Sequence, residues 1–500
     1  MVNRDADVIC IVYPVGQRVL SAAKRSFYPH LIIEHAYLHK GGGISHLIPQ
    51  QQDLWFVPLG GTGEIGMNFN VYGHDNQWLI VDCGVSFDEP LVAPYKTSPD
   101  SIATKHRVVA PDPTFMTERR DDIAAMVITH AHEDHIGAVA ALWPRLRCRI
   151  ITTPFTAAVL QRKLAQAGLA GKVPVDIVQP GAQKTVGPYT LQWLTMTHSI
   201  PEPQALLIHT AVGSVLHTAD WKIDGQPVSG SPFDANPFRA LGDSDLLAVV
   251  GDSTNATKAG FSISERICAE GLFSTIKACK GRVVVGCFGS NIARLISLGR
   301  IANKTGRYLA CVGRSLENMV GIAKETGYWP DDVTVITPGH VGYLPPEEVL
   351  VVATGSQGER RAALNRLATD ALPFFELEAG DTVIFSSIVI PGNEKPVERL
   401  VEKLEAKQIS VIQSEHSDLP IHASGHPCVE ELKLMYQWTR PQIVIPVHGE
   451  PVHLAAHAEV AKSVGVRKTY VGLNGDMYLL APQPGIRRDR VSTGRIPLDQ

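Results

Sequence analysis

The sequence has no apolar run that approaches the roughly 18 residues a membrane-spanning helix needs, which argues against a membrane protein. Cysteine is sparse: the eight residues contain no C-x-x-C pair and no regular spacing, which excludes a disulfide scaffold and favours free thiols. The first residues hold a short apolar run, but acidic residues precede it and no clean cleavage site follows, so we expect no secretory signal. We therefore expect a cytoplasmic protein.

Neither positive nor negative charge dominates the 500 residues, because the 46 basic and 50 acidic residues leave a net charge of only −4. A polycation is excluded. If the protein binds nucleic acid, a local positive site or a metal has to supply the attraction that the net charge does not.

The pattern of apolar, polar and turn-forming residues changes along the chain. Residues 1–52 show no sustained periodicity and are expected to form an atypical, disordered N-terminal extension, with sequence upstream of the true start or an ordinary helical appendage as the alternatives. From Asp53 to about residue 260, short apolar strands are separated by Gly, Pro and Asp and interleaved with helical stretches, which predicts a layered α/β domain.

Between residues 261 and 421, strand and helix alternate more regularly, and this pattern predicts a parallel sheet with crossover helices. From His422 to about residue 485 the sequence again shows the pattern of residues 53–260. We therefore expect one domain with a second domain inserted into it. Residues 486–500 are expected to form a tail or the start of a further region.

One nucleotide-binding motif is present but is not expected to bind a nucleotide. Residues 61–66 (GTGEIG) fit G-x-G-x-x-G after a strand, and a dinucleotide site also needs a helix directly afterwards. Here MNFNVYG alternates with a two-residue period and predicts a second strand instead. We therefore interpret the glycines as a hairpin-like turn.

A candidate metal site follows an apolar strand in MVITHAHEDHIGA, which contains His130, His132, Asp134 and His135. Residues two apart on an extended backbone face the same side, so His130 and His132 can bind one ion together. Asp134 and His135 come where the chain can turn and offer further ligands. Imidazole with carboxylate suits Zn²⁺ or Mn²⁺, whereas the alternative is a set of solvated histidines at a strand end.

Three more polar residues end apolar strands in the same way: His198 in LQWLTMTHS, Asp220 in SVLHTAD and His448 in QIVIPVHG. Any one of them alone would be explained by a structural role. Together with the first cluster they make seven ligands, the number expected for two ions that share a bridging carboxylate. Asp220 is the carboxylate outside the first cluster and the natural bridge.

The chain resembles the metallo-β-lactamase superfamily, and further segments narrow the resemblance to the β-CASP nucleases and bacterial ribonuclease J. These segments are PLGGTGEIGMN (58–68), VGDSTNA (250–256), VVATGSQGE (351–359), FSSIVIPGNE (385–394), HASGHP (422–427) and PVHGEPVHL (446–454). The resemblance implies an αββα sandwich with an inserted β-CASP α/β domain. It also implies two divalent metal ions, zinc or else manganese, one held by His130, His132 and His198, the other by Asp134, His135 and His448, with Asp220 between them.

The resemblance also implies catalytic roles. Asp134 would accept a proton from water, His426 would act as the general acid, and Asp252 would orient His426. His448 also occupies the third β-CASP motif, where a histidine favours RNA over DNA.

The resemblance assigns substrate phosphates to Gly289, Ser290 and Asn291 and to the 422–426 segment, in which His422, Ala423, Ser424, Gly425 and His426 follow one another. The alternative interpretation of Gly289–Asn291 is a strand-to-helix turn with an N-cap residue. Such a turn can also bind phosphate, so the two interpretations are compatible. Arg294 and Arg314 are candidates for an RNA channel, with solvated arginines as the alternative.

The implied function is metal-dependent hydrolysis of single-stranded RNA, 5′ to 3′ and favouring a 5′-monophosphate, with endonuclease activity left open. The alternatives are another hydrolase of the superfamily, such as a thioesterase or lactonase, and a catalytically silent RNA-binding scaffold. Family members carry a further C-terminal domain that contributes to oligomerisation, and about 50 residues follow His448, so a homo-oligomer is left open. Partner proteins of RNA decay are left open as well.

Overall fold

The computed structural model describes residues 47–88, 107–390 and 392–498; most of the expected N-terminal extension lies outside the described residues. In the described part, no helix combines the length and the apolar character needed to cross a bilayer. The strands form two large sheets that face each other, a six-stranded sheet and a small three-stranded one.

The first large sheet has eight strands in the order β23-β22-β1-β2-β3-β6-β7-β8. Its apolar side chains alternate between the two faces, as Phe56 and Val57 of β1 do, because successive residues of a strand point to opposite sides. The strands are β1 (Leu54–Gly60), β2 (Phe69–His74), β3 (Gln77–Val81), β6 (Ile123–Val127), β7 (Ile150–Thr152), β8 (Val175–Ile177), β22 (Met477–Ala481) and β23 (Gly485–Arg487).

The second large sheet has seven strands in the order β21-β20-β13-β12-β11-β10-β9. Its centre joins segments far apart in the sequence, because β13 pairs in parallel with both β12 and β20. The strands are β9 (Gln183–Val186), β10 (Tyr189–Thr195), β11 (Gln204–Thr210), β12 (Gly213–His217), β13 (Leu246–Asp252), β20 (Ile443–Val447) and β21 (Lys468–Thr469).

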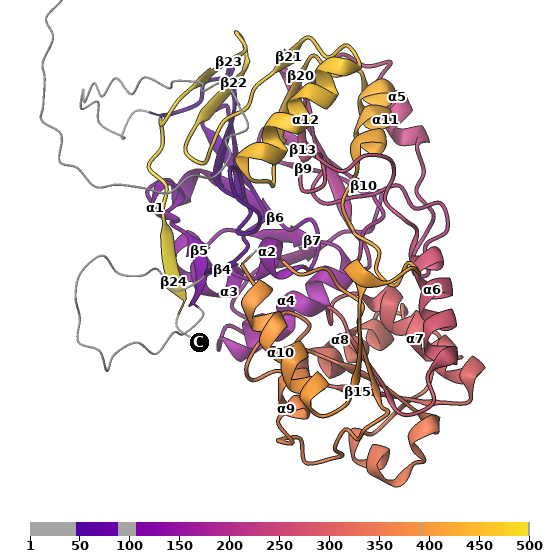
Figure 1. The fold of residues 1–500 in the computed structure, drawn as a ribbon. Helices are drawn as coiled ribbons and strands as arrows, with labels where there is room; N and C mark the ends of the chain where they lie inside the picture. Colours follow the sequence, from indigo (N-terminus) through magenta and orange to yellow (C-terminus); the bar gives the residue numbers. More distant parts are fainter. Residues whose placement is uncertain (1–46, 89–106, 391, 499–500) are drawn as a thin grey trace, which may run out of the picture. The chain divides into compact units, whose positions relative to one another are not determined.

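The two large sheets bury one apolar core between them, to which Phe56 and Tyr72 contribute from the first sheet and Leu191 and Ile445 from the second. Helices cover the outer faces. On the first sheet they are α1 (Thr114–Thr117), α3 (Val139–Leu146) and α4 (Pro154–Gln166); on the second they are α5 (Asn236–Leu241), α11 (Val429–Thr439) and α12 (Pro451–Ser463). This is the predicted αββα sandwich (Figure 1).

The six-stranded sheet is parallel throughout, in the order β16-β15-β17-β14-β18-β19. Helices α6 (Glu265–Ala278), α7 (Ile292–Thr305) and α8 (Arg314–Glu325) pack on one face, and α9 (Ala363–Ala368) and α10 (Glu394–Ala406) on the other. The strands are β14 (Val283–Gly286), β15 (Tyr308–Val312), β16 (Val335–Ile336), β17 (Val349–Ala353), β18 (Thr382–Phe385) and β19 (Ser410–Gln413). The predicted inserted α/β domain is confirmed as a fold, while the limits 261 and 421 stay predictions.

The GTGEIG segment is a turn between strands, as the sequence predicted. β1 and β2 pair antiparallel on either side of it, and Gly61, Gly63 and Gly66 have φ values of 82°, 87° and 94°, where a side chain is rarely tolerated. The three-stranded sheet joins β4 (Ser86–Asp88), β5 (Arg107–Pro111) and β24 (Arg495–Leu498), so part of the expected tail pairs with the domain.

Candidate metal centre

The predicted ligands sit just beyond the ends of strands in the two facing sheets. His130 and His132 follow β6, and Asp134 and His135 form the short helix α2 (Glu133–Ile136), for which His132 is the N-cap. The chain turns sharply beside the ligands: Ala219 and His448 have φ values of 48° and 52°, a conformation that costs energy for a residue with a side chain.

A first group contains His130, His132, His198 and Asp220, whose ligand atoms all lie within 4.8 Å of one another. His132 Nδ1 is 3.2 Å from His130 Nε2 and 3.0 Å from His198 Nε2, so three imidazole nitrogens converge on one point. Asp220 Oδ2 is 3.8 Å from His130 Nε2 and 3.6 Å from His198 Nε2.

The histidines of the first group are held neutral by their surroundings. Burial lowers the pKa of His132 to about 4, and burial also places the pKa values of His130 and His198 well below the ordinary value. Neighbouring imidazoles act in the same direction on all three. A neutral imidazole keeps the lone pair with which it binds a metal, so this group has the protonation state of a ligand set.

A second group contains Asp134, His135, Asp220 and His448, again within 4.8 Å of one another. His448 Nε2 is 3.1 Å from Asp134 Oδ2, and His135 Nε2 is 3.3 Å from Asp220 Oδ2. Burial opposes a charge on Asp134, but His135 and His448 outweigh it and hold the pKa of the carboxyl well below its usual range. Asp134 is therefore an ionised carboxylate.

Asp220 belongs to both groups, as expected for a bridging carboxylate. Its Oδ1 atom is buried and makes no hydrogen bond among the described residues, although it lies 3.5 Å from His448 Nδ1, and a buried carboxylate oxygen without a hydrogen bond is costly. A cation between the groups would satisfy that oxygen. The donor set and this oxygen without a hydrogen bond therefore fit a divalent metal site.

Asp82 supports the centre and was missed by the sequence analysis. It follows β3 with φ of 65°, accepts a hydrogen bond from the Thr129 backbone at 2.8 Å and lies 2.7 Å from His135 Nδ1. A carboxylate on one ring nitrogen fixes the other nitrogen as the ligand atom. The signal was present in the sequence, because the QWLIVDCG strand ends in an acidic residue just as SVLHTAD does.

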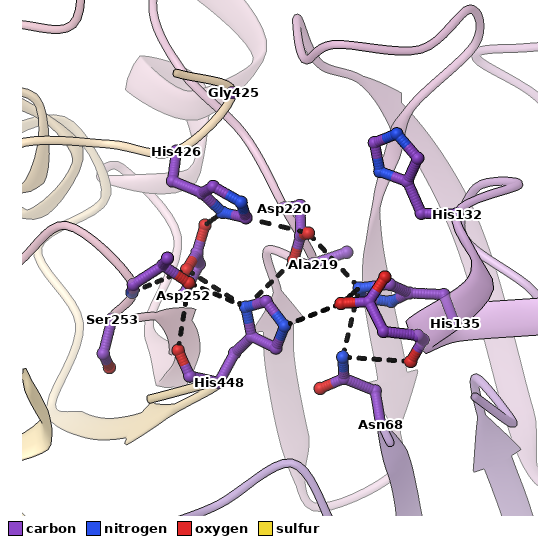
Figure 2. Close-up of polar contacts among 12 residues, drawn as sticks. Asn68, His132, His135, Ala219, Asp220, Asp252, Ser253, Gly425, His426 and His448 are labelled. Atoms are coloured by element: carbon purple, nitrogen blue, oxygen red, sulfur yellow. Dashed lines mark hydrogen bonds and ion pairs between the residues drawn. The ribbon is translucent and has the colours of Figure 1, made fainter. Parts of the chain in front are cut away.

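Asp252 and His426 form a pair beside the second group (Figure 2). His426 Nδ1 is 2.8 Å from Asp252 Oδ2, and 20% of the His426 side chain is exposed. Burial disfavours the imidazolium, but the carboxylates of Asp252 and Asp220 outweigh burial and raise the pKa of His426. These carboxylates therefore favour the protonated form of His426.

The segment 422–426 passes directly over the first group. Gly425 O is 2.6 Å from His198 Nδ1, and a Cβ at Gly425 would stand 2.5 Å from the His198 ring, so only glycine fits there. Asn255 Nδ2 donates to Ser424 Oγ at 2.8 Å. Ala423 is buried and His422 is partly exposed, with burial lowering the pKa of His422 to about 3.

The second predicted phosphate segment follows β14. Gly289 and Ser290 are partly exposed, whereas Asn291 is buried and is the N-cap of α7, accepting from Arg294 N at 2.9 Å. Arg294 is not on a channel surface: its side chain is 1% exposed and pairs with Glu265. The interpretation of Arg294 as a channel or solvated arginine was wrong, whereas Arg314 is exposed.

Three family models match the chain in sequence. They are the metallo-β-lactamase superfamily over residues 64–248, the ribonuclease J β-CASP domain over 280–404, and the RNA specificity domain of Zn-dependent metallo-hydrolases over 420–471. A ribonuclease J of Sinorhizobium meliloti is 41% identical over 458 residues, which cover 91% of this chain and 79% of that protein. The chain belongs to the ribonuclease J family.

As a member of the ribonuclease J family, the chain is a metal-dependent ribonuclease and a hydrolase, which removes the thioesterase, lactonase and silent-scaffold alternatives. Other ribonuclease J relatives are more distant or longer. One from Thermus thermophilus is 34% identical over 90% of this chain and 78% of its own length. One from Helicobacter pylori is 36% identical over 85% of this chain but 60% of its own length.

The fold is also found in a solved structure of a protein of unknown function from Enterococcus faecalis. Its TM-score is 0.58 at 14% identity, and the match covers 85% of this chain and 100% of the other. At that identity the likeness concerns the fold alone.

Proposed function

We propose that this member of the ribonuclease J family binds two divalent ions, zinc in the first instance, and degrades single-stranded RNA in the 5′ to 3′ direction. The observation that carries the proposal is the pair of four-residue groups that share Asp220. Manganese is the alternative ion, and endonucleolytic cleavage is a second mode of the same centre. We also keep a cytoplasmic location as a prediction.

The donor set favours zinc, because three imidazoles and one carboxylate make up the first group. Bound there, two ions would activate a water and would neutralise charge on the phosphodiester. The ligands would be His130, His132 and His198 for one ion and Asp134, His135 and His448 for the other, with Asp220 shared.

The chain's own residues move the protons. Asp134 is ionised and its side chain is 28% exposed, so it can accept a proton from a water at the centre. Asp252 pairs with Nδ1 of His426 and leaves Nε2 for the 3′-oxygen of the leaving nucleotide. The raised pKa favours protonated His426, the form that a general acid needs in this proposal.

The RNA end would be held by segments at the rim of the centre. Gly289 and Ser290 precede the 14-residue helix α7, whose N-terminus favours negative charge, and the hydroxyl and backbone groups of 422–425 lie beside His198 and His426. The Asn291 side chain is used within the protein, so its contribution would come from the helix it caps. A closed pocket for one phosphate would take a 5′-monophosphate and fit a triphosphate poorly.

Metal analysis of the purified chain and one matched pair of RNAs test the proposal. The RNAs share one sequence, carry a 5′-monophosphate or a 5′-triphosphate, and are labelled at each end in turn. We expect up to two zinc ions per chain and faster, processive release of nucleotides from the monophosphate end. Equal rates on both RNAs, or mononucleotides released first from the 3′ end, would contradict the 5′-exonuclease proposal while leaving the hydrolase intact.

A further inference from the structure

A buried ion pair joins two elements near the inserted sheet, outside the metal centre. The Arg294 side chain of α7 is 1% exposed and the Glu265 side chain of α6 is 3% exposed. Arg294 Nε donates to Glu265 Oε2 at 3.1 Å and Nη2 donates to Oε1 at 3.0 Å, while Asn291 Nδ2 donates to Oε1 at 3.1 Å. Burying such a pair gains little stability over apolar residues, so stability alone does not account for it.

One branch of contacts runs from Arg294 to the segment that carries His426. Arg294 Nη1 donates to Ser386 O at 3.0 Å and also contacts Ser386 Oγ. Ser386, directly after β18, donates from Oγ to Ile421 O at 2.6 Å. Ile421 is the residue before the 422–426 segment, so Arg294 and Ser386 fix the start of that segment from the side of the inserted sheet.

The far end of the same segment is fixed from the side of the sandwich. Asn255, just after β13, donates to Ser424 Oγ at 2.8 Å and to His426 O at 3.2 Å. The segment is therefore held at one end by Ser386 of the inserted domain and at the other end by Asn255 of the sandwich. The His426 ring itself contacts Asp252, and the backbone that carries the ring lies between the two anchors.

A second branch runs from Glu265 toward the first ligand group. Glu265 N donates to Asp224 Oδ2 at 3.0 Å, and Asp224 N donates to Thr197 Oγ1 at 3.1 Å. Thr197 is the neighbour of His198. The ion pair thus stands between the two stretches of chain that hold His198 and His426.

We propose that Arg294 and Glu265 are positioning residues, which set the place of His426 over the metal centre through Ser386 and Ile421. The inference rests on the proposed role of His426 as general acid. It predicts that loosening the anchor slows proton donation to the leaving 3′-oxygen but leaves metal and RNA binding unchanged.

The experiment compares two RNAs that differ in the leaving atom. In one, a bridging 3′-sulfur replaces the 3′-oxygen at the scissile bond; attack on phosphorus breaks the P–S bond, and sulfur leaves as a thiolate that needs no proton from His426. We expect Arg294→Lys to lower kcat on ordinary RNA by about 10²-fold, the effect of a small misplacement. Ser386→Ala, which removes one hydroxyl, should lower kcat roughly tenfold.

On the sulfur RNA both variants should match the unsubstituted protein, as His426→Ala should, with KM and metal content unchanged throughout. Arg162→Ala is the matched control, because Arg162 joins α4 to Glu325 of α8 at 2.6 Å in a partly exposed contact far from the 422–426 segment in sequence. It should cleave both RNAs normally, since an exposed ion pair contributes little.

Each outcome decides a different point. If His426→Ala is restored on the sulfur RNA but Arg294→Lys and Ser386→Ala are not, the positioning role is overturned and the acid survives. If His426→Ala is not restored either, the acid role itself falls. Should Arg294→Lys fail to fold, Ser386→Ala alone decides, because losing one hydroxyl leaves the ion pair intact.

Discussion

Different types of side chain follow the strands of the sandwich and the strands of the inserted sheet. Strands β6, β10, β12 and β20 of the sandwich are followed by histidines and aspartates that gather into the ligand groups. Strands β14 and β18 of the insert are followed by Gly289, Ser290 and Ser386, which are small and neutral. The sandwich can therefore hold ions, whereas the insert offers hydroxyls and backbone groups that place other parts of the molecule.

The largest effect should come from a sandwich ligand. His132→Ala removes the imidazole whose Nδ1 lies 3.2 and 3.0 Å from two other ligand nitrogens, so we expect loss of bound metal and of all detectable cleavage. Metal analysis and an RNA cleavage assay measure both. If zinc is bound, a structure of the loaded protein should place His130 and His132 about 2.0–2.1 Å from it.

His209→Gln is the control for that substitution, because His209 of β11 is partly exposed and contacts Ser214 rather than any ligand. It should keep metal and activity. A fully active His132→Ala protein would contradict the assignment of the metal ligands to the sandwich.

A smaller effect is expected between the two regions, at His426. His426→Ala should keep its metal and its RNA binding yet cleave about 10²–10⁴-fold more slowly, the contribution of a positioned acid. Single-turnover rates, metal content and RNA affinity measure the three quantities. His416→Ala, an exposed histidine of the insert, is the control, and loss of metal from His426→Ala would make His426 a ligand instead.

The smallest effect is expected at the end of β14. Ser290→Ala removes one hydroxyl beside the α7 N-terminus, so the preference for 5′-monophosphate over 5′-triphosphate RNA should fall by roughly tenfold or less. The ratio of initial rates on the two RNAs measures it. Metal content should not change. If it did, the view that the sandwich binds the metal while the inserted domain only positions other groups would be wrong.

Local patterns in the sequence predict a layered α/β domain, an inserted parallel sheet and the seven candidate ligands, whereas the αββα sandwich was implied by the family resemblance. An apolar strand followed by a histidine or aspartate is visible without a structure, as at His198 and Asp220. Asp82 carried the same signal and was missed because it stands apart from any histidine in the sequence, although the fold brings it to His135.

The Arg294–Glu265 pair was beyond the reach of that reasoning. An arginine in the first turn of a helix predicts exposure on average, and Glu265 lies 29 positions away with no pattern that connects the two. Only the packing of α6 against α7 makes them partners. Sequence patterns thus located residues that meet at strand ends and failed for those that meet through helix packing.

Under the proposed function, the contact between His198 and Gly425 would link metal affinity to the shape of the 422–426 segment. Gly425 O is 2.6 Å from His198 Nδ1, and Asn255 holds the residues on either side of Gly425, so the Asn255 anchor rather than Arg294 supports the orientation of His198. Thermodynamic linkage makes such coupling reciprocal: an RNA that tightens the segment raises the affinity for the ion by the factor with which the ion raises the affinity for that RNA. Under the proposed function, the apparent metal affinity of the protein would therefore depend on bound RNA as well as on the ligands.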